Sequence, residues 1–295
     1  MTATDERTTS APNLSVERPG IYDFPEAVYH ADPVRGGSLS STGARKLLEC
    51  PAKFHHDRYA KKAPNPTFDF GSAAHKMILG EGPELVVIDA NSYRTKDARE
   101  ARDAAHERDA IPLLPAEYRQ IEQMAAVLAD HPVAAKVFSP ERGLAERSLF
   151  WVDEETGVWC RARVDHLPEA DHGAQYFIAS DFKTTRSSDP KEIGRAVYDY
   201  GYHIQAAWYL EGIRALGIHP DPRMLFVFQE KSAPYLVTVI ELDGVALRIG
   251  HNQAKQALET YKRCSETGVW PGYSDRVETI ALPAWAERKL EEEGL

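Results

Sequence analysis

The sequence has no long hydrophobic run and few cysteines, and both absences exclude whole classes of protein. No stretch approaches the roughly 18 consecutive apolar residues of a membrane span. The first residues, MTATDERTTS, are polar and lack the apolar core of a secretory signal. Cys50, Cys160 and Cys264 are scattered without a C-x-x-C pair, which disfavours a disulfide framework and an iron–sulfur cluster. We therefore expect a cytoplasmic protein with no membrane partner.

Loops that bind nucleotide phosphates are missing as well. The chain contains no Gly-Lys pair, so it has no Walker A loop, and it contains no G-x-G-x-x-G segment. A G-x-S-x-G nucleophile elbow is also absent. Chemistry driven by ATP or by a dinucleotide therefore has no predicted site.

Positive charge is in the minority. The 35 Lys and Arg residues against 45 Asp and Glu residues give a net charge of −10. Proteins that coat DNA with their whole surface are usually basic, so this class is disfavoured. A nuclease remains compatible, because only the groove that holds phosphate must be positive. One basic run, from Arg45 to Lys62, is either a solvated face or a surface that contacts DNA phosphates.

The hydrophobic periodicity indicates an α/β fold with a mixed central β-sheet flanked by helices. Residues 1–20 are predicted to be a disordered tail, and residues 21–295 a single domain. The expected helices are Ser41–Cys50, Phe68–Leu79, 94–109, Pro115–Phe138, Ile193–Leu216 and Val245–Cys264. The expected strands are Arg147–Val152, Val158–Val164, Tyr176–Phe182, Met224–Phe228 and Tyr235–Ile240.

Two acids and a lysine come at the ends of predicted strands. Asp165 ends the second strand, in RARVDHLPE, and Asp181 and Lys183 end the third, in IASDFKTT. Alternate residues of a strand share a face, so Asp181 and Lys183 point one way and Phe182 the other. If the strands are neighbours, Asp165 meets Asp181 at the end of the sheet. Carboxylates that hold Mg²⁺ beside a cation suit phosphodiester hydrolysis, although D-x-K alone also arises by chance as a surface ion pair.

Four further residues are candidates for the same site, and each has an ordinary structural alternative. Gln205 and Tyr209, four apart on one helix face, either hold that helix on the sheet or brace the site. His75, in GSAAH, is either a buried core histidine or an imidazole ligand to a metal. Glu146 precedes the first of the three strands and is either a surface acid or a supporting acid.

In this order, the pieces GSAAH, VD, SDFK and QAAWY resemble the RecB family of PD-(D/E)XK nucleases. The longer stretches LSSTGARKLLECPAKF, WVDEETGVWCRARVD and YDYGYHIQAAWYLEG are similar to the RecE, or exonuclease VIII, type of nuclease domain. The similarity extends over nearly the whole chain after the tail. It implies a restriction-endonuclease-like core in which His75, Asp165, Asp181 and the backbone carbonyl of Phe182 bind the metal and Lys183 is catalytic.

The same resemblance implies further assignments. Gln205 and Tyr209 match the Q-x-x-x-Y motif of the family. Cys50, in ECPAKF, matches the segment where Cas4-like relatives place a cluster cysteine, but their C-terminal cysteine cluster is missing, so no iron–sulfur cluster is expected. From charge and position, Arg45 and Arg186 are candidates to hold a 5′-phosphate.

The implied activity is that of a Mg²⁺-dependent exonuclease, with Mn²⁺ as an alternative ion and no need for ATP. It would degrade the 5′-ended strand from the ends of linear double-stranded DNA and leave 3′ overhangs. The resemblance further implies a ring-shaped homo-oligomer, a trimer or tetramer, and a RecT-like single-strand annealing protein as partner in DNA recombination. Such proteins are bacterial or prophage-encoded.

Two other functions remain open at this point. The chain could be an endonuclease or flap nuclease with the same metal site, or an inactive relative that serves as a DNA-binding recombination scaffold. Retention of Asp165, Asp181 and Lys183 argues against the scaffold. The number of metal ions, and whether Lys183 acts as a base or stabilises charge, do not follow from the sequence.

Overall fold

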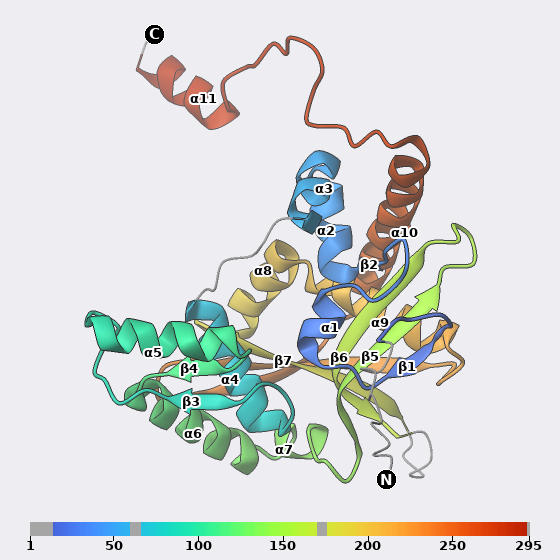
Figure 1. Cartoon of the computed structure of the whole chain (residues 1–295). Helices are drawn as coiled ribbons and strands as arrows, with labels where there is room; N and C mark the ends of the chain where they lie inside the picture. The colour runs from blue at the N-terminus through green and yellow to red at the C-terminus, as the bar shows by residue number, and fades with distance from the viewer. Residues whose placement is uncertain (1–13, 60–65, 170–175, 294–295) are drawn as a thin grey trace, which may run out of the picture.

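A computed structural model describes residues 14–59, 66–169 and 176–293 of the chain (Figure 1). Its main sheet has the strand order β1-β5-β6-β7-β8-β9, and β2 pairs with β6 beside this path. The β7–β8 and β2–β6 pairs are parallel and the other pairs are antiparallel, so the sheet is mixed, as predicted. The strands are β1 Gly20–Tyr22, β2 Leu39–Ser40, β5 Gly143–Val152, β6 Trp159–Pro168, β7 Phe177–Thr185, β8 Pro222–Glu230 and β9 Val237–Glu241.

Helices lie on both faces of this sheet (Figure 1). A separate parallel pair, β3 Leu85–Val87 with β4 Ile111–Leu113, was not predicted. No helix in the described ranges is long and apolar enough to span a membrane. The helices are α1 Glu26–His30, α2 Ser41–Glu49, α3 Pro51–Tyr59, α4 Pro66–Leu79, α5 Lys96–Glu107, α6 Pro115–Asp130, α7 Ala134–Val137, α8 Pro190–Tyr200, α9 Tyr202–Ala215, α10 Gly244–Thr267 and α11 Ala284–Glu292.

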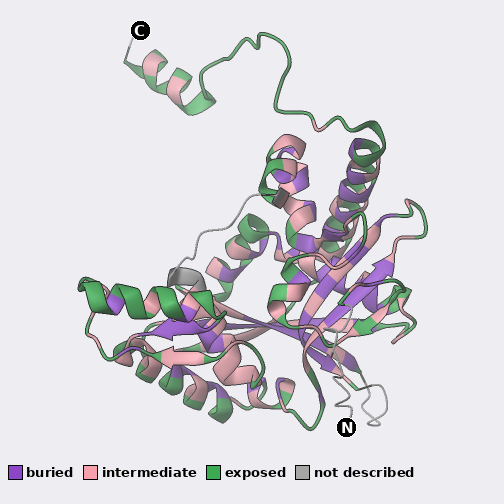
Figure 2. Cartoon of the chain, viewed as in Figure 1, coloured by how far each residue is buried: buried purple, intermediate pink, exposed green. Residues whose placement is uncertain are grey.

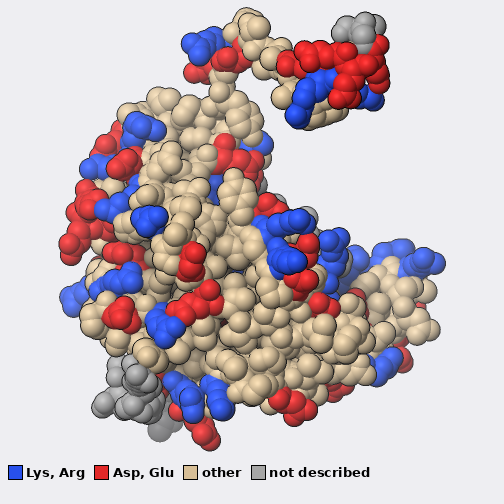
Figure 3. All heavy atoms as spheres, turned by 180° about the vertical axis from the view of Figure 1, so that it is seen from behind, with Lys and Arg blue, Asp and Glu red and all other residues tan. Residues whose placement is uncertain are grey.

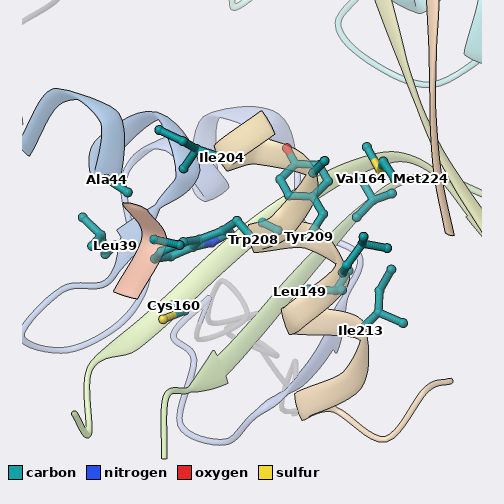
Figure 4. Packing of buried hydrophobic residues seen from close by; sticks show 14 of the residues in the cluster. Leu39, Ala44, Leu149, Cys160, Val164, Ile204, Trp208, Tyr209, Ile213 and Met224 are labelled. Atoms are coloured by element: carbon teal, nitrogen blue, oxygen red, sulfur yellow. The ribbon is translucent and has the colours of Figure 1, made fainter. Parts of the chain in front are cut away.

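The larger core lies on the face of the sheet covered by α2, α9 and α10. Trp208 and Ile213 of α9 pack there over Leu149 and Val164 of the β5–β6 hairpin (Figure 4). The indole of Trp208 also donates a hydrogen bond of 3.0 Å to the carbonyl of Arg161, which ties α9 to β6. Removal of this apolar surface from water fixes α9 above the centre of the sheet.

The opposite face of the sheet packs against α4 and α6. Phe182 of β7 and Val227 of β8 are fully buried there with Met124 of α6 and Ala73 of α4. The central strands are consequently buried on both faces, as Figure 2 shows by their purple colour. The small residues of GSAAH let the backbone of α4 approach the sheet closely.

The predicted helix Ile193–Leu216 was wrong in one respect, because it is two helices. Gly201 separates α8 from α9 with a φ of 70°, in the left-handed region that glycine occupies without a Cβ penalty. The predicted helix Pro115–Phe138 is likewise divided, into α6 and α7. The spacing of apolar residues alone does not reveal such breaks, because the helices before and after each break both carry buried apolar residues.

The strands that carry the candidate acids are longer than predicted. β6 continues to Pro168 and β7 to Thr185, so Asp165, Asp181 and Lys183 lie within strands rather than at their ends. The residues that follow Asp165 and Lys183 pair with neighbouring strands, residues 166–168 with β5 and Thr184 and Thr185 with β8. They extend the strands because neighbouring strands and helices satisfy their backbone groups.

The N-terminal tail is shorter than predicted. Val16 is buried, forms an isolated bridge to Val34 and packs near Phe150, and β1 begins at Gly20. Disorder up to residue 20 was therefore wrong for residues 14–20, while residues 1–13 lie outside the described part. At the other end, α11 has no buried residue and stands away from the body (Figure 1).

The candidate metal centre

Asp165 and Asp181 meet where β6 and β7 pair. The two strands are antiparallel, with His166 opposite Ser180, and this register places Asp165 beside Asp181. Both side chains are buried. The backbone N–H of Phe182 donates a 2.7 Å hydrogen bond to Oδ2 of Asp165, which holds this carboxylate against β7.

Lys183 and Gln205 hold the two oxygens of Asp181. The ammonium of Lys183 forms an ion pair with Oδ1, because residues two apart on β7 share a face. The amide of Gln205, on α9, donates a 2.6 Å hydrogen bond to Oδ2. Tyr209, one helical turn later on the same face of α9, is buried. Asp181 is thus oriented from both its own strand and the covering helix.

His75 and Glu146 approach Asp165 from two other elements. Nδ1 of His75, on α4, lies 3.3 Å from Oδ2 of Asp165 and 4.0 Å from Oε1 of Glu146, on β5. One ligand atom from each of these three residues lies within 4.8 Å of the other two. The ring of His75 packs edge-on against Phe182, which limits its rotation. Helix α4 and strands β5 and β6 therefore bring three potential metal ligands to one point.

Arg163, which is not among the predicted site residues, orients Glu146. Its Nε donates a 2.5 Å hydrogen bond to Oε2 of Glu146, and its Nη1 donates to the carbonyl of Phe24 and the hydroxyl of Ser148. A signal was present in the RARVD segment, because Arg163 and Asp165 are two apart on β6. The partner of Arg163 comes from another strand and could not be read from that spacing.

Burial and mutual repulsion of the carboxylates dominate the electrostatics. Burial, and then the charge of Asp165, raise the pKa of Glu146 to about 7. Burial, and then the charge of Asp181, raise the pKa of Asp165 well above its usual value. Burial would lower the pKa of Lys183, but the carboxylates of Asp181 and Asp165 outweigh it and raise that pKa. Burial lowers the pKa of His75, which favours the neutral imidazole that can bind a metal.

The donor set fits a hard divalent cation. Three carboxylates converge here, with Asp165 and Asp181 buried and Glu146 half-buried, and the main balancing charges are Lys183 and Arg163. Burial and the neighbouring carboxylates raise the pKa values of Glu146 and Asp165, so a bound cation would favour their ionised forms. Carboxylate oxygens are the preferred ligands of Mg²⁺ and Mn²⁺, and one imidazole is compatible with them. His75, Glu146 and Asp165 would hold such an ion, with Asp181 beside it.

Not all of the predicted site residues join this cluster. Phe182 contributes its N–H to Asp165, and the role of its carbonyl as a ligand stays a prediction. Arg45 lies on α2 against Gly201, where a Cβ would come 2.7 Å from its Cδ. Arg186 is exposed, just after β7. Neither arginine belongs to the His75–Glu146–Asp165 cluster.

The basic run from Arg45 to Lys62 forms α2 and α3, and several of its charges have partners inside the molecule. Lys46 pairs with Asp57, Lys53 with Glu49, and Arg58 with Asp32. Lys61 and Lys62 lie outside the described residues. The described part of this run is thus largely engaged in intramolecular ion pairs, and a DNA contact by it stays a prediction.

A family model described as a PDDEXK-like domain of unknown function (DUF3799) matches residues 40–283. The chain belongs to this family. The matched range includes His75, Glu146, Asp165, Asp181 and Lys183, and also Gln205 and Tyr209. No curated protein matches the sequence.

Comparison with solved structures supports the fold of this PDDEXK-like domain. A crystal structure of a "putative exonuclease" from Eubacterium rectale superposes with a TM-score of 0.54 and 16% sequence identity. The match covers 85% of this chain and 92% of the other. A second structure, SSO0001, has a TM-score of 0.29 at 15% identity, covers 65% of this chain and 84% of its own, and carries no argument. The predicted PD-(D/E)XK fold and family are confirmed.

Proposed function

We propose that this PDDEXK-like domain is a metal-dependent deoxyribonuclease that hydrolyses DNA phosphodiesters. The observation that carries the proposal is the convergence of Asp165, Asp181 and Lys183 with His75 and Glu146 in one buried site. Membership of the family and the fold shared with a "putative exonuclease" support it. An inactive scaffold would have no need of buried carboxylates that repel one another, because such a cluster costs stability unless a cation offsets it.

Each side chain has a role that follows from its contacts. A bound Mg²⁺ or Mn²⁺ would polarise a phosphoryl oxygen and acidify a water molecule. Gln205 and Arg163 keep Asp181 and Glu146 in place, since each donates a hydrogen bond to a carboxylate oxygen. Lys183 places its ammonium beside Asp181, where it can orient the attacking water or offset negative charge in the transition state.

The finer proposal is an ATP-independent exonuclease that degrades the 5′-ended strand of linear double-stranded DNA. The similarity to the RecE type of nuclease domain supports this direction, and also supports a ring-shaped trimer or tetramer and a RecT-like annealing partner. The surface is mixed in sign, and Lys and Arg gather beside an indentation on one side (Figure 3). A local basic region of this kind reconciles DNA binding with a net charge of −10.

Replacement of one buried carboxylate tests the nuclease activity. Asp181→Asn should abolish nucleotide release from end-labelled linear duplex in the presence of Mg²⁺, because the amide carries no charge to support the ion. Asp221→Asn is the matched control, since Asp221 is exposed and lies just before β8, where Pro222 pairs with Phe177 at the far end of β7. Chelation with EDTA should stop the wild-type reaction. Equal release by wild type and Asp181→Asn would remove the assigned site.

The requirement for an end and the direction of attack need separate substrates. Covalently closed circles should stay intact under conditions in which the same DNA, once linearised, is degraded. Cleavage of circles at a comparable rate would favour an endonuclease with the same metal site. Phosphorothioate blocks at the 5′ ends should protect a linear duplex, whereas protection by 3′ blocks alone would reverse the proposed direction.

A further inference from the structure

Three tyrosines, Tyr198, Tyr200 and Tyr202, occupy alternate positions where α8 ends and α9 begins. Tyr202 is the innermost. The ammonium of Lys183 lies 5.1 Å from the centre of its ring, and the ring packs 5.7 Å from those of Phe226 and Phe228 on β8. Contacts on both sides therefore fix Tyr202 between the core and the metal centre. Tyr202 is not among the site residues predicted from the sequence.

Tyr200 extends this aromatic contact to the surface. Its ring centre lies 5.7 Å from that of Tyr202, at an interplanar angle of 33°, and 63% of the residue is exposed. Tyr200 is the last residue of α8, and the left-handed Gly201 then turns the chain into α9. Two successive contacts thus connect the exposed ring to Lys183, at distances of 5.7 and 5.1 Å. Tyr200 stands at the edge of the catalytic site rather than on a remote surface.

The surface beside Gly201, the residue that follows Tyr200, combines aromatic and charged groups. A cavity of about 400 Å³ beside Gly201 is lined by Arg45 and Tyr198, and also by the acids Glu49 and Asp199. Tyr198 is 75% exposed, and its ring lies parallel to that of His203. Because the cavity carries acids as well as an arginine, positive charge alone does not distinguish this surface. The exposed ring of Tyr200, in contact with Tyr202, does.

We infer that Tyr200 is a stacking platform for a base of the bound DNA strand, close to the scissile phosphate. The inference rests on the proposed nuclease function and names a contact of that same site. Aromatic rings bind bases without regard to sequence, because every base presents a π-face. Tyr202 buttresses the platform at a fixed distance from Lys183. A base on Tyr200 has no duplex neighbour stacked on that face, as is the case at the end of a linear strand.

Substitutions at Tyr200 separate stacking from other roles. Tyr200→Ala should weaken binding of linear DNA, seen as KM and as Kd in EDTA, by roughly 5- to 150-fold. Tyr200→Phe and Tyr200→Trp should keep the wild-type values, because both retain a ring. Tyr176→Ala is the matched control, since Tyr176 is a half-exposed tyrosine just before β7, at the far end from Lys183, and Arg223 lies over its ring. The exposure of Tyr200 makes a folding defect in its variants unexpected, and their melting temperatures check this.

Photo-crosslinking tests the contact directly. DNA with 5-iododeoxyuridine at successive positions from the end should form an adduct on Tyr200 of the wild-type protein, and the adduct should map to one or two positions.

The outcomes distinguish this inference from the proposed function. If the wild type is a nuclease and Tyr200→Ala binds DNA as tightly as the wild type, the platform alone is overturned. The platform is also overturned if Tyr200→Phe binds DNA as weakly as Tyr200→Ala. DNA binding that depends on the Tyr200 ring, without any nucleotide release, would keep the platform and overturn the nuclease. A wild-type protein that neither binds nor cleaves DNA would overturn both, and would leave the exposed ring as a contact for another protein.

Discussion

Glu146 has a φ of 54° in the middle of β5, a conformation that residues other than glycine rarely adopt. The pairing with β6 keeps the same register on either side, with Ala145 opposite His166 and Arg147 opposite Val164. No residue is inserted, so the local twist places Glu146 next to Asp165 without shifting the strand. Such strain costs roughly 1–3 kcal/mol and persists where the surrounding structure enforces it. Here the enforcing contact is the hydrogen bond from Arg163.

The raised pKa of Glu146 predicts how stability changes with pH in the metal-free protein. Its pKa moves from 4.5 to about 7 on folding, so the folded state binds the proton more tightly than the unfolded state. The free energy of unfolding should therefore fall as pH rises from about 4.5 to about 7, by an amount on the order of 3 kcal/mol. Urea unfolding at a series of pH values in EDTA measures this.

Glu146→Gln provides the comparison for that measurement. The amide does not titrate, so the difference in stability between variant and wild type should grow over this pH range and level off above it. Saturating Mg²⁺ should offset the loss of stability of the wild type at the higher pH values, because a cation favours the ionised carboxylate. If the difference in free energy of unfolding between the two proteins stayed constant across this pH range, the surroundings of Glu146 would not raise its pKa.

At the level of elements, α9 determines the geometry of the site, and two glycines determine how α9 lies. Gly201 ends α8 and lets α9 begin in a new direction, which aims Gln205 at Asp181. Gly250 of α10 lies against α9 so closely that a Cβ would come 2.0 Å from the backbone carbonyl oxygen of His203. The period of apolar residues predicted helical segments here. It could not reveal that the segment from Ile193 is broken or that α10 needs a glycine.

Gly250→Ala should therefore destabilise the protein. The added methyl group meets backbone atoms of α9, so α9 and α10 must move apart, at a cost of about 1–3 kcal/mol or more. Activity should fall together with stability, because displacement of α9 moves Gln205.

Gly194→Ala is the matched control, since Gly194 lies within α8 and no atom lies within 4 Å of its Cβ position. That change should stabilise by about 0.5–1 kcal/mol, through the helix preference of alanine. Thermal unfolding compares the two variants.

At the level of the whole molecule, the C-terminal residues contribute little to the fold. The family match ends at residue 283, and α11 follows it with no buried residue. The segment contacts the body further back. Trp270 packs on Phe54 and His55, the N–H of Ala52 donates to the carbonyl of Pro271, and the ammonium of Lys53 lies over the ring of Tyr273. These contacts, and not α11, anchor the segment.

Truncation after Pro283 should leave the free energy of unfolding within about 0.5 kcal/mol of the full chain, because surface residues without buried contacts contribute little. Chemical denaturation measures this. Trp270→Ala in the full-length chain is the contrasting variant and should cost several times more, since its ring packs against three aromatic side chains. A large loss on truncation would mean that α11 is buried against another part of the protein or against a second copy.

The sequence by itself determined which candidate side chains share a face within one element. Asp181 and Lys183 share a face because strands have a period of two, and Gln205 and Tyr209 share one because helices have a period near four. Only the tertiary structure decided which residues from different elements meet. Glu146, Arg163 and Tyr202 reach the site through strand register, a left-handed backbone angle and a helix break. These depend on contacts between segments far apart in the chain, which no local spacing encodes.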